Sequence, residues 1–253
     1  MGVYHLYEKV LEREVKGGPV PSHIAFILDG NRRWARRRNL PPWLGHKAGA
    51  DLVERVLDWC YELGVTTVTL YVLSTENIAR RPRDELEKLL EIIEEKVEWL
   101  LETGKLEKRG VRFKALGRIE LLPPSLVGKL RTLEERTSRF SGRYLNLAIA
   151  YGGRDEILDA VRSIAEEVAE GRLNPAGIDD AVFKKFLYTG DLPHPDPDLV
   201  IRTSGELRIS NFLLWQIAYS ELFFIDVYWP EFRRIDLLRA IRSYQKRKRR
   251  FGG

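Results

Sequence analysis

The sequence predicts a single α/β domain, with a mostly parallel central sheet that is covered by helices on both faces. Apolar runs of strand length alternate with segments of helical periodicity along the whole chain. Several of these runs end abruptly in polar residues, as strands do where an open parallel sheet binds its ligands. The 253 residues and the apolar content of 44% suit one domain with a sizeable core, so we expect a single domain over residues 1–253.

The expected strands are short runs rich in β-branched and aromatic residues. The run 24–28 is apolar throughout, and the run 65–73 reads Val-Thr-Thr-Val-Thr-Leu-Tyr-Val-Leu before it ends in Ser-Thr-Glu-Asn. Further runs of this kind cover residues 111–116, 144–150, 199–201 and 223–228.

The expected helices lie between these strands. Apolar residues recur at helical spacing over 84–106, and a helix over 45–63 is followed by Gly64, a common C-terminal stop. A short helix over 4–15 and a Gly-Gly-Pro turn fill residues 1–22. The other expected helices run from Asp29 to near Asn39 and over 124–138, 155–170, 179–186 and 236–248, and the last of them leads into a basic tail that ends at residue 253.

Composition excludes several kinds of site and partner. Cys60 is the single cysteine, which excludes a disulfide framework and a cysteine zinc site. The net charge of +5 owes much to Lys246–Arg250, a run typical of a solvated tail that can also contact anionic lipid, nucleic acid or an anionic substrate. No signal peptide is visible, and the apolar window 211–229 contains central charges, which favour buried core over a membrane span. We therefore expect a cytoplasmic protein.

The first strand is followed by an acid, a glycine, an amide and two arginines, Asp29 to Arg33. The strand delivers Asp29 to the carboxyl edge of the sheet, Gly30 lets the backbone approach a ligand, and the next residues open a helix whose free N–H groups face the same place. A carboxylate beside guanidiniums suits Mg²⁺ and phosphate oxygens, because Mg²⁺ prefers one or two carboxylates together with substrate phosphates. The alternative is a surface salt bridge after a buried strand.

Polar groups follow other strands as well, at 74–77, 152–154 and 202–210. The last of these segments carries two arginines and two serines, which can hold a second phosphate group by charge-assisted bonds. Glu221 follows in an apolar context and needs a partner, either a structural arginine or a metal ion. The chain has no Walker A loop, no Gly-x-Gly-x-x-Gly signature and no aspartate-rich prenyltransferase motif, so two phosphate sites and a large apolar complement point to a prenyl diphosphate and its co-substrate.

These segments together resemble the cis-prenyltransferase family, whose best-known member is undecaprenyl diphosphate synthase. The resemblance extends from about His23 to Gly253, with the motifs in the order of the family. The motifs that carry it are Asp29-Gly-Asn-Arg-Arg-Trp34, Gly45-His-Lys-Ala-Gly49, Ser74-Thr-Glu-Asn77, Tyr151-Gly-Gly-Arg154, the segment from Arg202 to Gln216, and Glu221.

The resemblance implies an enzyme that adds isopentenyl diphosphate units, in Z configuration, to an allylic diphosphate such as farnesyl or geranylgeranyl diphosphate. It implies Mg²⁺ held by Asp29, a homodimer in which Glu221 supplies a second metal carboxylate at or near the interface, and peripheral membrane contact for product release. Asn77 matches the position assigned to proton removal, and since an amide is a very poor base we expect it to orient Ser74, a water or a phosphate oxygen. The substrate-binding positions implied are Gly30, Asn31, Arg32, Arg33, Trp34, His46, Ser74, Thr75, Glu76, Arg80, Arg202, Arg208, Ile209 and Ser210.

The chain departs from the family pattern at several positions. Pro42 stands where bacterial members carry a phosphate-contacting arginine, and an arginine among residues 36–38 is the expected substitute. An extra residue near Pro82 leaves two candidates for one arginine, since strict spacing favours Arg80 and spacing from Glu85 favours Arg81. The apolar face over 86–101 is expected to line a product tunnel.

Two rival interpretations remain. A non-catalytic partner subunit of the same fold is expected to lack Asp29 or the paired arginines, and this chain has both. A basic nucleic-acid-binding protein is suggested by the C-terminal charge run, but the chain has no base-stacking or groove-reading motif, so we expect no nucleic-acid partner. The sequence therefore favours a Mg²⁺-dependent, homodimeric polyprenyl diphosphate synthase that supplies a glycosyl carrier lipid.

Overall fold

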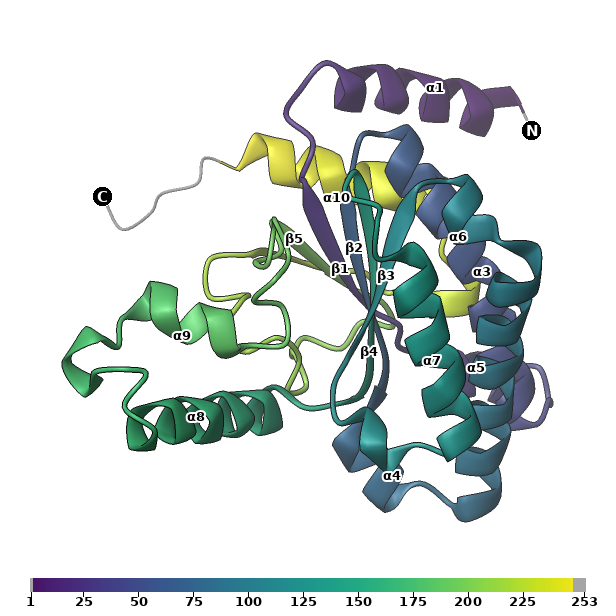
Figure 1. The fold of residues 1–253 in the computed structure, drawn as a ribbon. Helices are drawn as coiled ribbons and strands as arrows, with labels where there is room; N and C mark the ends of the chain where they lie inside the picture. The colour runs from purple at the N-terminus through teal and green to yellow at the C-terminus, as the bar shows by residue number, and fades with distance from the viewer. Residues whose placement is uncertain (1, 248–253) are drawn as a thin grey trace.

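The computed structural model describes residues 2–247, and within them six parallel strands form one sheet in the order β3-β4-β2-β1-β5-β6 (Figure 1). This confirms the predicted α/β class and its parallel sheet. Residue 1 and residues 248–253, which include most of the basic tail, lie outside the described residues. The strands are β1 (His23–Ile27), β2 (Thr67–Ser74), β3 (Val111–Leu116), β4 (Arg143–Tyr151), β5 (Leu199–Arg202) and β6 (Glu221–Phe224).

Helices lie on both sides of the sheet, as the sequence predicted (Figure 1). The first of them, α1 (Gly2–Lys16), packs on the last, α10 (Arg234–Lys246). The others are α2 (Asn31–Arg36), α3 (Pro42–Glu62), α4 (Thr75–Arg80), α5 (Arg83–Thr103), α6 (Lys105–Lys108), α7 (Pro124–Thr137), α8 (Gly153–Ala169) and α9 (Asp180–Phe186), with short 3₁₀ turns at Ile119–Leu121, Pro175–Gly177 and Trp229–Glu231.

The two faces of the sheet have separate apolar cores, because successive strand residues point to opposite sides. In β1, Ile24 and Phe26 belong to the larger core, which α3, α5, α7 and α10 cover. Ala25 and Ile27 belong to the smaller core, where the irregular segment 209–217 supplies Phe212 and Leu213. The apolar window 211–229, which was expected to be buried core, is so only in part: Phe212, Leu213 and Ile217 are buried, whereas Trp215 and Tyr219 are exposed. None of the described helices is long and apolar enough to cross a bilayer.

The strand order fixes where a ligand can bind. Strands β1 and β5 are neighbours in the middle of the sheet. The strand that follows β1 in the chain, β2, lies on one side of this pair, and the strand that follows β5, β6, lies on the other side. Connections that diverge in this way leave a crevice beyond the carboxyl ends of the two strands, where open α/β sheets bind their ligands. Asp29 and Arg202 lie at the two sides of this crevice.

Several predicted boundaries were wrong. The helix expected over 84–106 ends at Thr103, because Gly104 adopts a left-handed conformation with φ of 58° and a separate short helix follows. The strand expected over 223–228 starts at Glu221 and ends at Phe224. Beyond it, the carbonyls of Ile225 and Val227 accept hydrogen bonds from backbone N–H groups of the loop after β5. The helix after Asp29 stops at Arg36, and α4 was not predicted because its six residues are too few to show a period.

Replacement of Phe26 tests the larger core. Its ring is fully buried, with ring centroids 5.9 Å from Trp229 and 6.1 Å from Phe232. Phe26→Ala should lower the free energy of unfolding by about 3–5 kcal/mol, the usual cost of this truncation in a core. The measurement is urea denaturation, with Leu121→Ala at an exposed position as the control. Equal losses in the two variants would contradict the packing described.

Candidate active site

The backbone after β1 turns sharply toward the crevice at Gly30. Its φ of 102° lies in the left-handed region, and a Cβ there would come within 2.7 Å of the Tyr228 ring. Glycine is therefore required at this turn. Helix α2 starts at the next residue, Asn31, and no side chain caps it, which leaves its first N–H groups available to the predicted anion.

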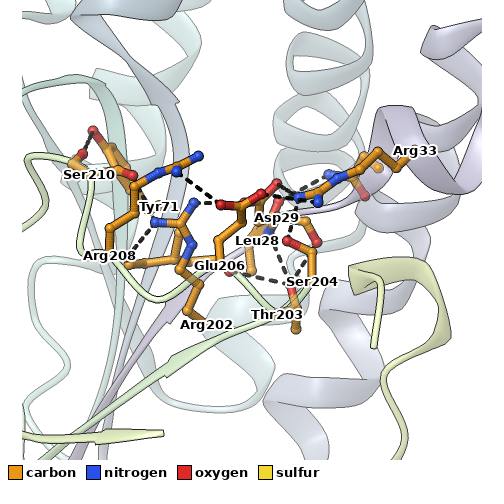
Figure 2. A network of polar contacts seen from close by, with 12 residues as sticks. Leu28, Asp29, Arg33, Tyr71, Arg202, Thr203, Ser204, Glu206, Arg208 and Ser210 are labelled. Atoms are coloured by element: carbon orange, nitrogen blue, oxygen red, sulfur yellow. Dashed lines mark hydrogen bonds and ion pairs between the residues drawn. The ribbon is translucent and has the colours of Figure 1, made fainter. Parts of the chain in front are cut away.

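The carboxylate of Asp29 lies between two guanidiniums (Figure 2). Its Oδ2 accepts a hydrogen bond from Arg202 at 2.7 Å, and its Oδ1 lies 3.3 Å from Arg33. Burial alone would raise the pKa of Asp29, but the hydrogen bonds and charges of Arg202 and Arg33 hold that pKa below its usual value. Asp29 is therefore ionised at neutral pH and has guanidiniums on two sides.

Thr203 fixes the backbone of Asp29 to the end of β5. Its hydroxyl accepts from the Asp29 N–H at 3.0 Å and donates to the Asp29 carbonyl at 2.7 Å. These two bonds set the position of the carboxylate relative to Arg202, which precedes Thr203 in the chain.

The second predicted anion site is the loop after β5. Arg202 is buried and donates to Ser210 Oγ at 2.7 Å and to the Arg208 carbonyl. The Arg208 side chain is exposed and pairs with Glu206 at 2.9 Å, while Ile209 packs on the smaller core. The structure therefore brings Arg202 and Ser210 together beside Asp29 and places Arg208 at the solvent edge.

Glu206 is a member of this site that sequence reasoning missed. Its carboxylate lies 3.2 Å from Arg33 and 2.9 Å from Arg208, so it connects the two arginine groups (Figure 2). The signal that could have found it is an acid placed between two arginines of a predicted phosphate loop.

The same loop stores backbone strain. Ser204, Ser210, Asn211 and Leu213 all have positive φ, between 43° and 79°. Such conformations cost about 1–3 kcal/mol each outside glycine and cluster at ligand sites. The Tyr71 hydroxyl, which donates to the Ser210 carbonyl at 3.3 Å, helps to hold the loop in this conformation.

A third polar cluster lies at the start of α3 and α5 and contains His46. Arg81 donates to His46 Nε2 at 3.0 Å and pairs with Glu85 at 3.0 Å, and Arg32 lies 3.3 Å from the same carboxylate. Of the two arginines that spacing left open, Arg81 is the one in this cluster, whereas Arg80 is exposed. Burial, and then the charge of Arg81, lower the pKa of His46, so the imidazole is neutral at neutral pH.

The residues that follow β2 brace the site from its other side. Ser74 caps α4 by accepting from the Asn77 N–H at 3.0 Å, and Thr75 donates to Asp155 at 2.8 Å. Glu76 accepts from Asn211 at 2.6 Å, which connects this segment to the strained loop. None of residues 74–77 lines the cavity beneath Asp29.

A cavity of about 460 Å³ extends from Asp29 into the larger core. The sheet contributes Leu70, Val72, Leu145 and Leu147 to its wall, and α5 contributes apolar residues from Leu89 to Leu100. Part of the apolar face that was expected to line a product tunnel, from Leu89 to Leu100, therefore lies against this cavity. Among residues 36–38, only Arg36 lines the cavity, and the substitution for the arginine missing at Pro42 stays a prediction. Arg38 instead pairs with Glu231 and covers the ring of Trp34, which does not line the cavity.

Glu221 does not join this site within one chain. It is the first residue of β6, opposite Leu199, whereas Asp29 lies beyond the carboxyl end of β1. Its side chain bonds to Arg247. Three strand residues separate it from the level of Arg202, which is about 10 Å at the usual rise. The C-terminal element that includes Arg250 lies outside the described residues.

An anion site lined by arginines, placed over an apolar cavity at the edge of a parallel sheet, defines a class of protein that binds the diphosphate of an apolar chain. The family model described as "Putative undecaprenyl diphosphate synthase" matches residues 27–252. The chain belongs to this undecaprenyl diphosphate synthase family and is a cis-prenyltransferase.

Similar proteins come from archaea, and similar structures from a plant and a bacterium. A tritrans,polycis-undecaprenyl-diphosphate synthase (geranylgeranyl-diphosphate specific) from Methanopyrus kandleri is 56% identical, over 99% of this chain and 91% of its own length. One of the same description from Pyrococcus abyssi is 51% identical, over 98% and 93%. Lavandulyl diphosphate synthase from Lavandula x intermedia, solved with dimethylallyl diphosphate, superimposes with a TM-score of 0.87 at 36% identity, over 95% of this chain and 100% of that one. A probable undecaprenyl diphosphate synthase from Campylobacter jejuni gives a TM-score of 0.75 at 31% identity, over 93% and 100%.

Replacement of Arg81 tests the His46 cluster. Arg81→Leu removes a positive charge and a donor from His46, so the histidine pKa should rise by about one unit. The measurement is an NMR pH titration of the histidine rings, with Arg80→Leu at the exposed neighbour as the control. The pKa of His46 is lower in the folded protein than the unfolded value of about 6.5, so the unfolded chain binds the proton more readily. The free energy of unfolding should therefore fall as the pH drops below about 6.5, and the contribution of His46 is fully present above that pH. An unchanged His46 titration in Arg81→Leu would contradict the contact.

Proposed function

We propose that this chain elongates an allylic diphosphate with isopentenyl diphosphate units in Z configuration, and that its product is a polyprenyl diphosphate such as undecaprenyl diphosphate. The observation that carries the proposal is the Asp29 carboxylate, flanked by Arg202 and Arg33, at the mouth of the apolar cavity. The names of the archaeal relatives favour geranylgeranyl diphosphate as the primer over farnesyl diphosphate. Such a product would serve as the precursor of a glycosyl carrier lipid.

The site offers one diphosphate position on each side of Asp29. The allylic diphosphate would lie at the start of α2, with Arg33 and Arg36 as cationic partners and its apolar tail in the cavity. Isopentenyl diphosphate would lie at the loop after β5, held by Arg202, Arg208 and Ser210. These guanidiniums would stabilise the charge that builds on the departing diphosphate as the allylic C–O bond ionises.

The donor set at Asp29 fits a magnesium ion. One ionised, partly exposed carboxylate beside two expected diphosphates is the combination that Mg²⁺ prefers, and the described residues contain no cluster of three or more acids, histidines or cysteines that would favour another metal. Mg²⁺ would neutralise diphosphate oxygens while Asp29 holds it. Glu221 could act on the same ion only from a second copy of the chain.

The last step is the loss of a proton from the new bond. Asn77 follows Ser74 on the capped start of α4, and both are partly or fully buried. A neutral amide cannot accept the proton at neutral pH, so its role would be to orient Ser74, a water or a phosphate oxygen that does.

A second copy of the chain is the partner that the surface favours. Trp215, Tyr219, Leu158 and Val161 are large exposed apolar residues, and β6 is an edge strand of the sheet. Exposed apolar surface and an open edge are both features that association covers. We propose a homodimer, with contact to a membrane surface when the apolar product is released.

Product sizing tests the proposed function. The purified protein is incubated with Mg²⁺, labelled isopentenyl diphosphate and one allylic primer at a time. Long polyprenyl products with geranylgeranyl diphosphate, lost on chelation and restored by Mg²⁺, are the expected result. A single condensation that stops would contradict chain elongation.

Asp29→Ala should abolish condensation and leave the fold intact. Loss of the carboxylate removes the predicted metal ligand, and the loss of one preorganised electrostatic partner costs about 10²–10³ in kcat. Turnover and circular dichroism are measured together, with Asp180→Ala on the exposed start of α9 as the control. Near-normal turnover of folded Asp29→Ala would remove the metal assignment.

Arg202→Ala should mainly weaken isopentenyl diphosphate binding. Truncating one partner of a buried, charge-assisted contact costs about 2–5 kcal/mol, so the KM for this substrate should rise about thirtyfold or more. Steady-state kinetics with each substrate varied in turn provide the measurement, with Arg162→Ala on the surface of α8 as the control. An unchanged KM for isopentenyl diphosphate would refute the assignment.

A further inference from the structure

The cavity has a second charged wall besides the one formed by Asp29 and its neighbouring arginines. It is the seam between α3 and the segment that runs from α5 into α6. Helix α3 presents three acids at helical spacing there, and the facing segment presents three bases. We call this the α3–α6 seam, and it consists of Asp51, Glu54, Asp58, Lys96, Lys105 and Arg109.

Three ion pairs close the α3–α6 seam. Lys96 lies 2.5 Å from Asp51, Lys105 pairs with Glu54, and Arg109 pairs with Asp58. Five of these six side chains also line the cavity, Asp58 being the exception. The Asp51 and Lys96 side chains are nevertheless 55% and 43% exposed to solvent. The wall at this seam is therefore about one side chain thick.

A charged seam parts more easily than an apolar one. Ion pairs that are open to solvent contribute little to stability, because both charges regain their hydration when they separate. Separating two packed apolar helix faces would instead expose apolar surface to water, which is unfavourable in proportion to the area. The sequence thus places weak contacts at a side of the cavity where the wall is thin.

The segment that carries two of the three bases is short and is bounded by glycines. Helix α6 has four residues, and Gly104 before it and Gly110 after it have φ of 58° and 62°. Left-handed glycines at both ends allow a short segment to change direction without strain in its neighbours. Within this segment, Lys105 also lies 4.9 Å from the ring of Trp99, an apolar surface at the cavity side of the seam.

The cavity is small for the product. A volume of about 460 Å³ falls in the range of about 300–1,000 Å³ that encloses a drug-sized ligand, whereas an undecaprenyl chain is more than twice as long as a geranylgeranyl primer. We propose that the lengthening prenyl chain leaves the cavity through the α3–α6 seam, and that its three ion pairs separate to let the chain pass. The inference rests on the proposed function, because only a product longer than the cavity needs such an exit.

A reversible bridge across the seam tests the inference. The variant Glu54→Cys/Lys105→Cys is joined by a short bis-methanethiosulfonate reagent, which a reducing agent removes. The matched control is Glu98→Cys/Lys129→Cys, which replaces an ion pair of 3.0 Å between α5 and α7 away from the cavity. The native Cys60 is fully buried, and burial raises the pKa of its thiol, so it should not react.

Products are sized over time with labelled isopentenyl diphosphate, before bridging, after bridging and after reduction. The bridged seam variant should carry out the first condensation at the rate of the bridged control, accumulate short chains, and make long chains again once reduced. Long chains from the bridged seam variant would overturn this inference alone. Loss of the first condensation on bridging would also overturn it, because the bridge would then act on the reaction site. Short products from the untreated native enzyme would contradict chain elongation itself, and the exit with it.

Discussion

The geometry of the site depends on one electrostatic contact, the partly exposed carboxylate of Asp29 held at 2.7 Å by the buried guanidinium of Arg202. Arg202 is almost fully buried, and it keeps Ser210 and the Arg208 carbonyl as acceptors when Asp29 is replaced. The neighbouring strands β1 and β5 deliver the two residues to the same edge, and Thr203 fixes their backbones to each other. The parallel order of the sheet thus determines where the two diphosphates can lie.

The site joins two environments that usually exclude each other. On one side, arginines and free helix N–H groups can bind anions, and on the other, apolar side chains enclose a cavity within the larger core. An amphiphilic substrate satisfies both, because its diphosphate compensates the guanidinium charges while its tail fills apolar space. The strained loop 204–213 fits the same view, since strain at a ligand site keeps polar groups in place before the ligand arrives.

Much of this could be predicted from the sequence, for identifiable reasons. The alternation of strands and helices predicted the parallel α/β class, and the abrupt end of the first strand predicted Asp29 at a ligand-binding edge. Contacts between distant segments could not be predicted in the same way. The position of Glu206 between Arg33 and Arg208 depends on a loop with five left-handed residues, four of them not glycine. Only the fold shows that Arg81 rather than Arg80 contacts His46. Glu221 is a different case: its motif suggests a metal carboxylate supplied at or near a homodimer interface, so its place away from Asp29 within one chain leaves that prediction untested.

A crystal structure with Mg²⁺, isopentenyl diphosphate and an unreactive allylic thiodiphosphate tests the central claim most directly. The account predicts one metal ion on Asp29, the allylic diphosphate at the start of α2 with its tail between α3 and α5, and isopentenyl diphosphate on Arg202 and Ser210. Diphosphates bound away from Asp29, or an allylic tail outside the cavity, would contradict it.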